Sequence, residues 1–148
     1  MTALPFVDEH RLLVPAPPAV VWPALAAHVA GMRGAGALAR VLGTSPRRAS
    51  GVPLEPGATV PGFAVTAAEP ERLVRLSGRH RFSRYALTFT LAAAPGGTVL
   101  GARTDAAFPG PHGRAYRLLV ISSGAHRLAV ARMLRDVRRR SAAGETSA

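Results

Sequence analysis

Histidine and tyrosine are the residues of this chain whose types could do acid–base or ligand-orienting chemistry. No two of the five histidines are four residues apart, the spacing at which two side chains on one helix bind a metal. Because the chain has no cysteine, thiolate zinc sites, iron–sulfur clusters and cysteine nucleophiles are excluded. A nucleophile elbow, a phosphate loop and a dinucleotide fingerprint are also absent from the sequence. We therefore expect neither a metal nor a cofactor.

His80 stands out because of its place in a strand pattern. In the segment Arg72–Phe82, one face carries Val74, Leu76, His80 and Phe82. The opposite face carries mainly arginine and serine, which is typical of a solvated surface. The parity therefore directs His80 toward the interior, where it could meet a ligand. The alternative is a histidine hydrogen-bonded at the rim of the sheet.

The next strand has the clearest alternation in the chain. Tyr85, Leu87 and Phe89 share one face, as expected for a half-buried antiparallel strand. A tyrosine on that face could orient a ligand carbonyl, and so could Tyr116 further along the chain. Alternatively, both tyrosines are amphipathic core residues that each make one hydrogen bond.

One long helix is predicted over Gly113–Arg140. At 100° per residue, Tyr116, Val120, Ser123 and Arg127 fall on one apolar stripe. A buried arginine needs an anionic partner, either Asp105 or Glu9, or a group on a ligand. The alternative for Arg127 is a side chain that extends past the sheet edge to water.

A second apolar group on this helix faces another way. Leu118, Ile121 and Leu128 cannot all pack against the sheet if the first stripe does. An exposed apolar row of this kind is typical of a contact with another element or subunit. The helical turns around Leu38–Leu42 could cover this row within the chain, and a homodimer that buries it is the other expectation.

The remaining elements are assigned from periodicity and from proline and glycine. Helical patterns cover Ala19–Val29, with a kink or a late start at Pro23, and one or two turns of Ala37–Leu42. The predicted strands are Val7–Val14, Thr59–Ala67, Arg72–Phe82, Tyr85–Ala93 and Thr98–Phe108.

Length and hydropathy indicate a single folded unit. The chain has 148 residues, of which 48% are hydrophobic, enough for one core. We expect one domain over residues 1–140 and a flexible tail over 141–148. Neither an apolar run of 18 residues nor a signal-peptide pattern is present, so we expect a cytoplasmic protein without a membrane span.

The net charge of +11 usually suggests nucleic acid as a partner. All nineteen basic residues are arginine, however, and lysine, asparagine and glutamine are absent. This bias is typical of the codons of a GC-rich genome, as in a high-GC bacterium, so we discount the charge as functional evidence. Aromatic residues interleaved with the arginines, which base stacking needs, are also missing, so nucleic-acid binding is not expected.

The order of elements and three segments resemble a known superfamily. The segments are Val14-Pro15-Ala16-Pro17-Pro18-Ala19-Val20-Val21-Trp22, Arg81-Phe82-Ser83-Arg84-Tyr85-Ala86-Leu87-Thr88-Phe89 and Gly113-Arg114-Ala115-Tyr116. They are similar to the START-like (SRPBCC) superfamily, which includes pollen-allergen-type proteins, lipid-transfer domains and polyketide cyclases. Pro23 departs from its pattern, because a helix former is typical there. The resemblance implies an α+β helix-grip fold, in which a curved antiparallel sheet wraps around a long C-terminal helix.

The resemblance also implies a cavity between sheet and helix. We expect it to bind a small hydrophobic, polyketide-like or lipid-like molecule. From strand parity and helical phase, we expect its lining to include His80, Tyr85, Leu87, Phe89, Tyr116, Val120, Ser123 and Arg127. One alternative is a cyclase-like or hydrolytic enzyme that acts by general acid–base chemistry. Another is an interaction module that dimerises or associates weakly with nucleic acid through its arginines.

Overall fold

The structure is a computed structural model that describes residues 4–32, 46, 48–122 and 124–146. At residues 120, 122, 145 and 146 only the backbone is described. The helical turns predicted within Ala37–Leu42 lie outside the described residues. Among the described helices, none combines the length and the apolar character that crossing a bilayer requires.

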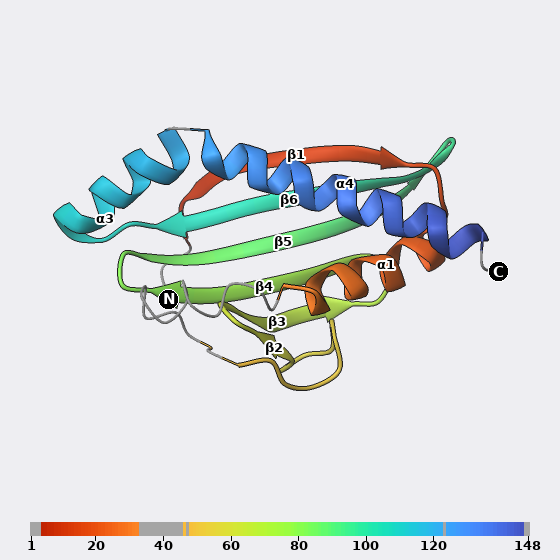
Figure 1. Ribbon diagram of the computed structural model, residues 1–148, viewed down its shortest axis with the longest axis horizontal. Helices are drawn as coiled ribbons and strands as arrows, with labels where there is room; N and C mark the ends of the chain where they lie inside the picture. Colours follow the sequence, from red (N-terminus) through yellow and green to blue (C-terminus); the bar gives the residue numbers. More distant parts are fainter. Residues whose placement is uncertain (1–3, 33–45, 47, 123, 147–148) are drawn as a thin grey trace.

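Six antiparallel strands form one open sheet in the order β1-β6-β5-β4-β3-β2 (Figure 1). Their bounds are β1 Phe6–Val14, β2 Thr59–Val60, β3 Phe63–Glu69, β4 Leu73–His80, β5 Ser83–Ala94 and β6 Gly97–Ala107. Hairpins connect β2 to β6 in sequence order, whereas β1 joins the far edge by pairing with β6. The sheet is thus a meander from β2 to β6 that the N-terminal strand β1 extends at the β6 edge.

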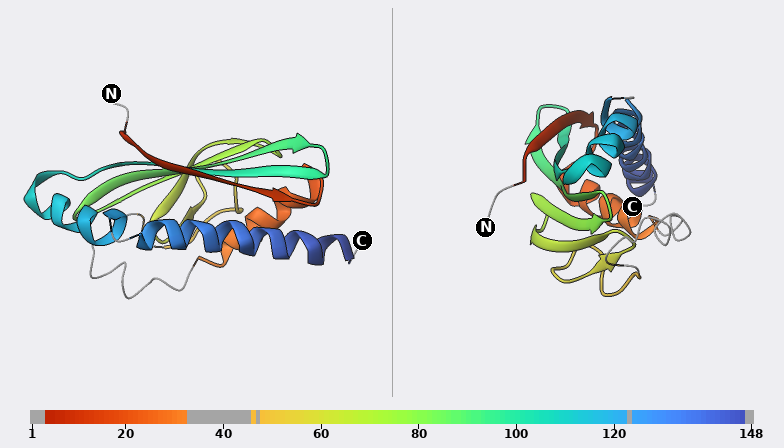
Figure 2. Two further views of the ribbon diagram at one scale, coloured as in Figure 1. Left: turned by 90° about the horizontal axis from the view of Figure 1, so that it is seen from above. Right: turned by 90° about the vertical axis from the view of Figure 1, so that its left-hand side faces the viewer.

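The helices lie along one face of this curved sheet (Figure 2). They are α1 Pro18–Ala30, α3 Gly110–Arg117, the π-helical turn η1 Leu118–Ser122, and α4 Ala125–Thr146. α1 begins at Pro18, where the missing N–H costs nothing, and continues through Pro23. A curved antiparallel sheet with a long C-terminal helix on one face confirms the predicted α+β helix-grip architecture.

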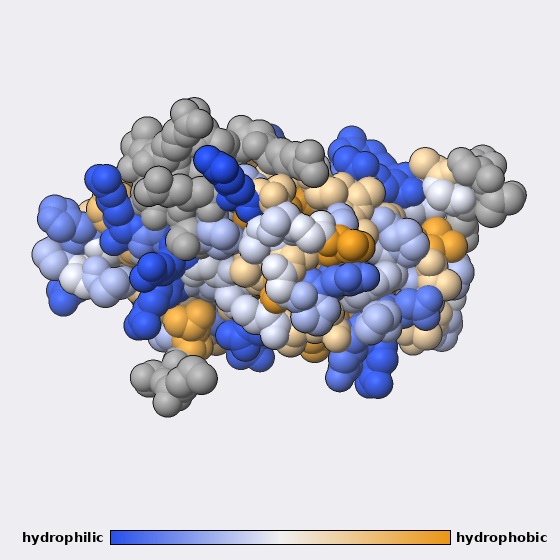
Figure 3. Space-filling view, turned by 90° about the horizontal axis from the view of Figure 1, so that it is seen from below, coloured by the Kyte–Doolittle hydropathy of each residue, from blue (hydrophilic) through white to orange (hydrophobic). Residues whose placement is uncertain are grey.

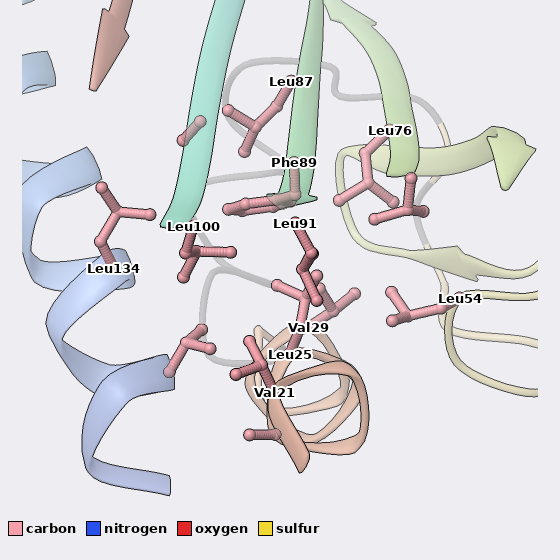
Figure 4. Packing of buried hydrophobic residues seen from close by; sticks show 14 of the residues in the cluster. Val21, Leu25, Val29, Leu54, Leu76, Leu87, Phe89, Leu91, Leu100 and Leu134 are labelled. Atoms are coloured by element: carbon pink, nitrogen blue, oxygen red, sulfur yellow. The ribbon is translucent and has the colours of Figure 1, made fainter. Parts of the chain in front are cut away.

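The core lies between the sheet and the two helices α1 and α4. Phe89 is fully buried at its centre, with Leu25 and Val29 from α1 and Leu134 from α4 pointing toward the sheet (Figure 4). The face of the molecule shown in Figure 3 has its hydrophobic residues scattered among hydrophilic ones. The buried apolar side chains of the strands, α1 and α4 form one cluster, and burial of apolar surface of this kind is the usual source of stability in such folds.

Two predicted elements are divided in the structure. The strand predicted over Thr59–Ala67 is two strands, because Pro61 and Gly62 form a turn in which Gly62 has a φ of 90°. The single helix predicted over Gly113–Arg140 is also wrong. It is interrupted next to Gly124, whose φ of 84° is incompatible with a continuing α-helix.

The C-terminal helix is longer than predicted. α4 continues to Thr146 instead of ending near Arg140, and Ser141, placed in the predicted tail, is fully buried. The hydroxyl of Ser141 donates a hydrogen bond to the carbonyl of Val137, 2.8 Å away. A serine can satisfy its hydroxyl within a helix in this way, which is why it did not end α4.

Candidate functional site

A pocket of about 230 Å³ lies between the sheet and the segment formed by α3, η1 and the start of α4. Its walls are mainly apolar, with a few histidine, tyrosine, serine and threonine side chains among them. The lining residues are Phe63, His80, Ser83, Tyr85, Ala86, Leu87, Thr104, Ala106, Phe108, Tyr116, Ile121, His126, Ala129, Val130 and Met133.

The strand register explains why there is space for a pocket above this part of the sheet. Tyr85 on β5 is flanked by Gly78 on β4 and by Ala106 on β6, so its neighbours across the sheet are small. One step toward the core, Leu87 is flanked by Leu76 and Thr104. Cross-strand partners share a face of the sheet, so the small residues leave space that larger ones would fill.

Aromatic rings line one side of the pocket. The ring of His80 lies edge to face with Tyr116, with 4.6 Å between centroids, and 5.6 Å from Tyr85. Phe82 stacks on Tyr116 at 5.7 Å. The hydroxyl of Tyr85 donates a 2.8 Å hydrogen bond to the carbonyl of Gly62, which ties the ring to the β2–β3 turn. These contacts hold the rings in place and link α3 to the sheet.

Burial keeps the titratable groups of this cluster neutral near pH 7. It lowers the pKa of His80, and it raises the pKa of Tyr116. Burial, assisted by the nearby Tyr116, raises the pKa of Tyr85 to about 12. Nδ1 of His80 accepts a hydrogen bond from the N–H of Phe82 at 3.1 Å, so the neutral ring carries its hydrogen on Nε2. The cluster therefore offers neutral hydrogen-bond donors.

A second polar group lies where α4 begins. Nε2 of His126 is 3.0 Å from the hydroxyl oxygen of Thr104 and 3.3 Å from Oδ1 of Asp8. Asp8 also accepts a 3.2 Å hydrogen bond from Nε2 of His10. Thr104 and Asp8 are direct partners between β6 and β1, and both Thr104 and His126 line the pocket.

His126, Asp8 and Thr104 were not among the residues predicted to line the site. The available signal was the alternation of Asp8 with Leu12 and Val14 in the first strand, which puts a carboxylate on the core-facing side. A carboxylate on that side needs a partner, and His126 is one.

Four of the predicted site residues are brought together. His80, Tyr85, Leu87 and Tyr116 all line the pocket. Phe89, two residues beyond Leu87 on β5, does not line the pocket and is fully buried in the core. The side chain of Val120 and the whole of Ser123 lie outside the described residues.

Arg127 was predicted on the buried stripe, and this placement is wrong. The side chain is exposed, and Arg127 is not among the residues that line the pocket. The break next to Gly124 changes the helical phase between Tyr116 and Arg127, so the two no longer share a face. The expected carboxylate partners are engaged elsewhere, Asp105 with Arg103 at 3.2 Å and Glu9 with Arg11 at 3.1 Å.

Metal-ligating side chains do not cluster in the described parts of the chain: no three His, Cys, Asp or Glu residues there converge as a metal site.

No protein-family model matches the sequence, and no curated protein sequence is detectably similar to it. Solved structures share its fold. The chain is 16% identical to CalU16 from Micromonospora echinospora, with a TM-score of 0.54 over 97% of this chain and 94% of that one. It is 16% identical to a truncated norcoclaurine synthase from Thalictrum flavum, with a TM-score of 0.55 over 94% and 96% of the two chains.

A third similar structure is DynU16, a protein of the dynemicin biosynthetic locus. It is 17% identical, with a TM-score of 0.51 over 88% of this chain and 45% of that chain. Together with the strand order and the helix along the sheet, these similarities show that the chain has the helix-grip fold, an open antiparallel sheet with a long C-terminal helix along one face.

Proposed function

We propose that the protein binds a small, largely apolar molecule in the pocket between the sheet and the α3–η1–α4 segment. The observation that carries this proposal is the pocket itself, with apolar walls and a few converging polar groups. This composition is typical of sites for small organic ligands. Two fold neighbours, a norcoclaurine synthase and a protein of a biosynthetic locus, are named for small-molecule biosynthesis, which is consistent with such a ligand.

The pocket's size limits the ligand. A cavity of roughly 150 Å³ holds benzene, and drug-sized molecules occupy about 300–1,000 Å³. A volume of about 230 Å³ lies between these two cases. It suits a molecule of one or two rings better than a long acyl chain, so of the expected ligand classes we favour a cyclic, polyketide-like compound over a lipid.

The aromatic cluster would fix the ligand's orientation. Tyr116 presents a hydroxyl that hydrogen-bonds no described residue, and the neutral ring of His80 carries its hydrogen on Nε2. Two donors at one wall suit a carbonyl oxygen on the ligand. The raised pKa of Tyr85 and of Tyr116 favours hydrogen bonding over proton abstraction by either tyrosine. These features support binding over the acid–base chemistry of the two tyrosines.

The test is to fill the pocket. Ala129 lines it and is exposed, so Ala129→Trp adds bulk there without disturbing the buried core. Ala115→Trp on α3 is the matched control, since Ala115 is exposed and does not line the pocket. We would titrate the protein with 2-naphthol and follow the fluorescence of the naphthalene ring.

We expect saturable binding to the native protein and to Ala115→Trp, and at least tenfold weaker binding to Ala129→Trp. Equal affinity for all three proteins would contradict the proposal, because the ligand would then sit elsewhere.

A further inference from the structure

In the group formed by Asp8, Thr104 and His126, the donor and the acceptor of the hydrogen bond between His126 and Asp8 can be assigned. A carboxylate only accepts, so Nε2 of His126 must donate to Oδ1 of Asp8 across the 3.3 Å that separates them. The same nitrogen lies 3.0 Å from the Thr104 hydroxyl oxygen. All three residues are well packed, since Thr104 is 6% exposed and the side chains of Asp8 and His126 are 18% and 19% exposed.

The other ring nitrogen is left without a described partner. With the hydrogen on Nε2, the neutral imidazole carries a lone pair on Nδ1, and no described residue hydrogen-bonds this atom. His126 lines the pocket next to Thr104, so we take this lone pair as the acceptor that a ligand bound there would meet. A ligand that satisfies it must supply an O–H or N–H group.

We propose that His126 selects a hydroxyl group on the bound molecule, and that the ligand class is therefore hydroxylated aromatic compounds. The phenolic O–H donates to Nδ1 of His126, while the ring lies against Tyr116 and His80. Asp8 is a positioning residue, because it orients the imidazole and holds the hydrogen on Nε2. This inference rests on the proposed function and adds the chemistry of the ligand to it.

The charge of the ligand should let this site discriminate between a phenol and a carboxylic acid of the same shape. A carboxylate on the ligand has no hydrogen to donate to Nδ1, and it would approach the carboxylate of Asp8. The net charge of +11 would draw any anion to the surface, so a preference for the neutral hydroxyl would run against the overall field. Selectivity for hydroxyl over carboxylate is thus specific to this geometry.

The strand register sets the distance that the ligand must span. Thr104 is the partner of Leu87, two residues along β5 from Tyr85. Two residues of a strand advance by about 7 Å, which is close to the length of two fused rings. A fused two-ring phenol can therefore reach His126 with its hydroxyl while its ring contacts the aromatic cluster.

The experiment compares three probes of one shape, 2-naphthol, 2-methoxynaphthalene and 2-naphthoate, on the full chain. Affinities are measured by titration of the naphthalene fluorescence. We expect 2-naphthol to bind the native protein about tenfold more tightly than the ether, the effect of one buried hydrogen bond of ordinary strength. The carboxylate is expected to bind more weakly than 2-naphthol.

Substitutions identify the residue responsible. His126→Phe keeps a ring but removes the acceptor, and we expect the ratio between 2-naphthol and the ether to fall to about one. His126→Asn, whose Oδ1 can take the place of Nδ1, is expected to restore part of the ratio. Asp8→Asn should lower the ratio severalfold, since the amide no longer requires the hydrogen on Nε2. His112→Phe on exposed α3 is the control and should leave the ratio unchanged.

Each outcome decides between the inference and the proposed function. Equal affinity of 2-naphthol and the ether for the native protein overturns the inference and leaves the proposed function standing. Tightest binding of 2-naphthoate also overturns the inference, because the overall charge would then dominate. If none of the three probes binds, both the inference and the proposed function are wrong. The comparison of probes on the native protein needs no variant, so a variant that fails to fold does not prevent the test.

Discussion

Nδ1 of His28 on α1 lies 2.7 Å from Oδ2 of Asp136 on α4, which joins the two helices that cover the sheet. Asp136 also accepts a 2.8 Å hydrogen bond from Arg140. The hydrogen bond from Arg140, followed by that from His28, lowers the pKa of Asp136 to about 2. The ionised carboxylate is thus a structural link between helices, on the side of the fold away from the pocket.

Loss of this carboxylate should make stability less dependent on pH in acid. A carboxyl group with a lowered pKa stabilises the folded state above its unfolded value of 3.8 and loses this contribution as the pH falls toward about 2. We expect Asp136→Asn to lower the free energy of unfolding by about 1 kcal/mol at pH 7 and by much less near pH 2. Urea denaturation at both pH values measures the difference.

The control for this prediction is Glu9→Gln, which removes a carboxylate from a mostly exposed pair with Arg11. It should change the free energy of unfolding by no more than about 0.5 kcal/mol. A pH-independent difference between the native protein and Asp136→Asn would contradict the assigned role.

Gly78→Ala should destabilise the pocket wall. A Cβ at this position would collide with the carbonyl oxygen of Gly62, which accepts the hydrogen bond from Tyr85. We expect Gly78→Ala to lower the free energy of unfolding by more than about 1 kcal/mol. This decrease should exceed that of Tyr85→Phe, which removes only the hydrogen bond. Thermal denaturation compares the two variants. Gly144→Ala in α4, where a Cβ would make only an ordinary contact with Val20, is the control and should be neutral or stabilising.

Phe89→Ala should lower the free energy of unfolding. The ring is fully buried among core side chains, so its removal leaves a cavity that costs about 3–5 kcal/mol. Phe6→Ala provides the comparison, because Phe6 is 55% exposed and should lose at most about 1 kcal/mol, including its contact with Arg103. Urea denaturation would contradict the assignment if the two variants lost similar amounts.

Leu118→Glu and Leu128→Glu should leave the monomer folded. These side chains are 66% and 50% exposed, so we expect each substitution to change the free energy of unfolding by no more than about 0.5 kcal/mol. If the predicted homodimer forms through them, sedimentation should give a dimer for the native chain and a monomer for the double variant. Unfolding of the variants would instead show that both leucines belong to the core.

The strand residues of the site were predictable because parity is a local property. Alternation along β5 places Tyr85 and Leu87 on the inner face, and the same rule places His80 correctly. Parity does not give depth, however. Phe89 and Leu87 have the same parity and both belong to the core, yet only Leu87 also lines the pocket.

The positions of the helical residues were less predictable, because the face on which a residue lies depends on whether the helix continues without interruption. The π-helical turn η1 and the left-handed Gly124 both interrupt the α-helical phase between Tyr116 and Arg127, and Arg127 is exposed. The pairing of Asp8 with Thr104 depends on the register between the first and last strands. Strand parity could place Asp8 on the inner face, but local sequence contains no signal for a register between segments so far apart, so the pairing of Asp8 with Thr104 and His126 is visible only in the fold.

The interruption next to Gly124 also bears on how such a protein can diversify. Among the α3 residues Gly110–Arg117, only Gly113 is buried, and the segment is tied to the sheet by ring contacts of Tyr116. The core residues that the C-terminal helical segment supplies, Val130, Leu134 and Val137, all lie beyond the interruption in α4. Substitutions in α3 and η1 can therefore reshape one wall of the pocket at little thermodynamic cost. A lineage could change the molecule it recognises while its scaffold remains under unchanged selection.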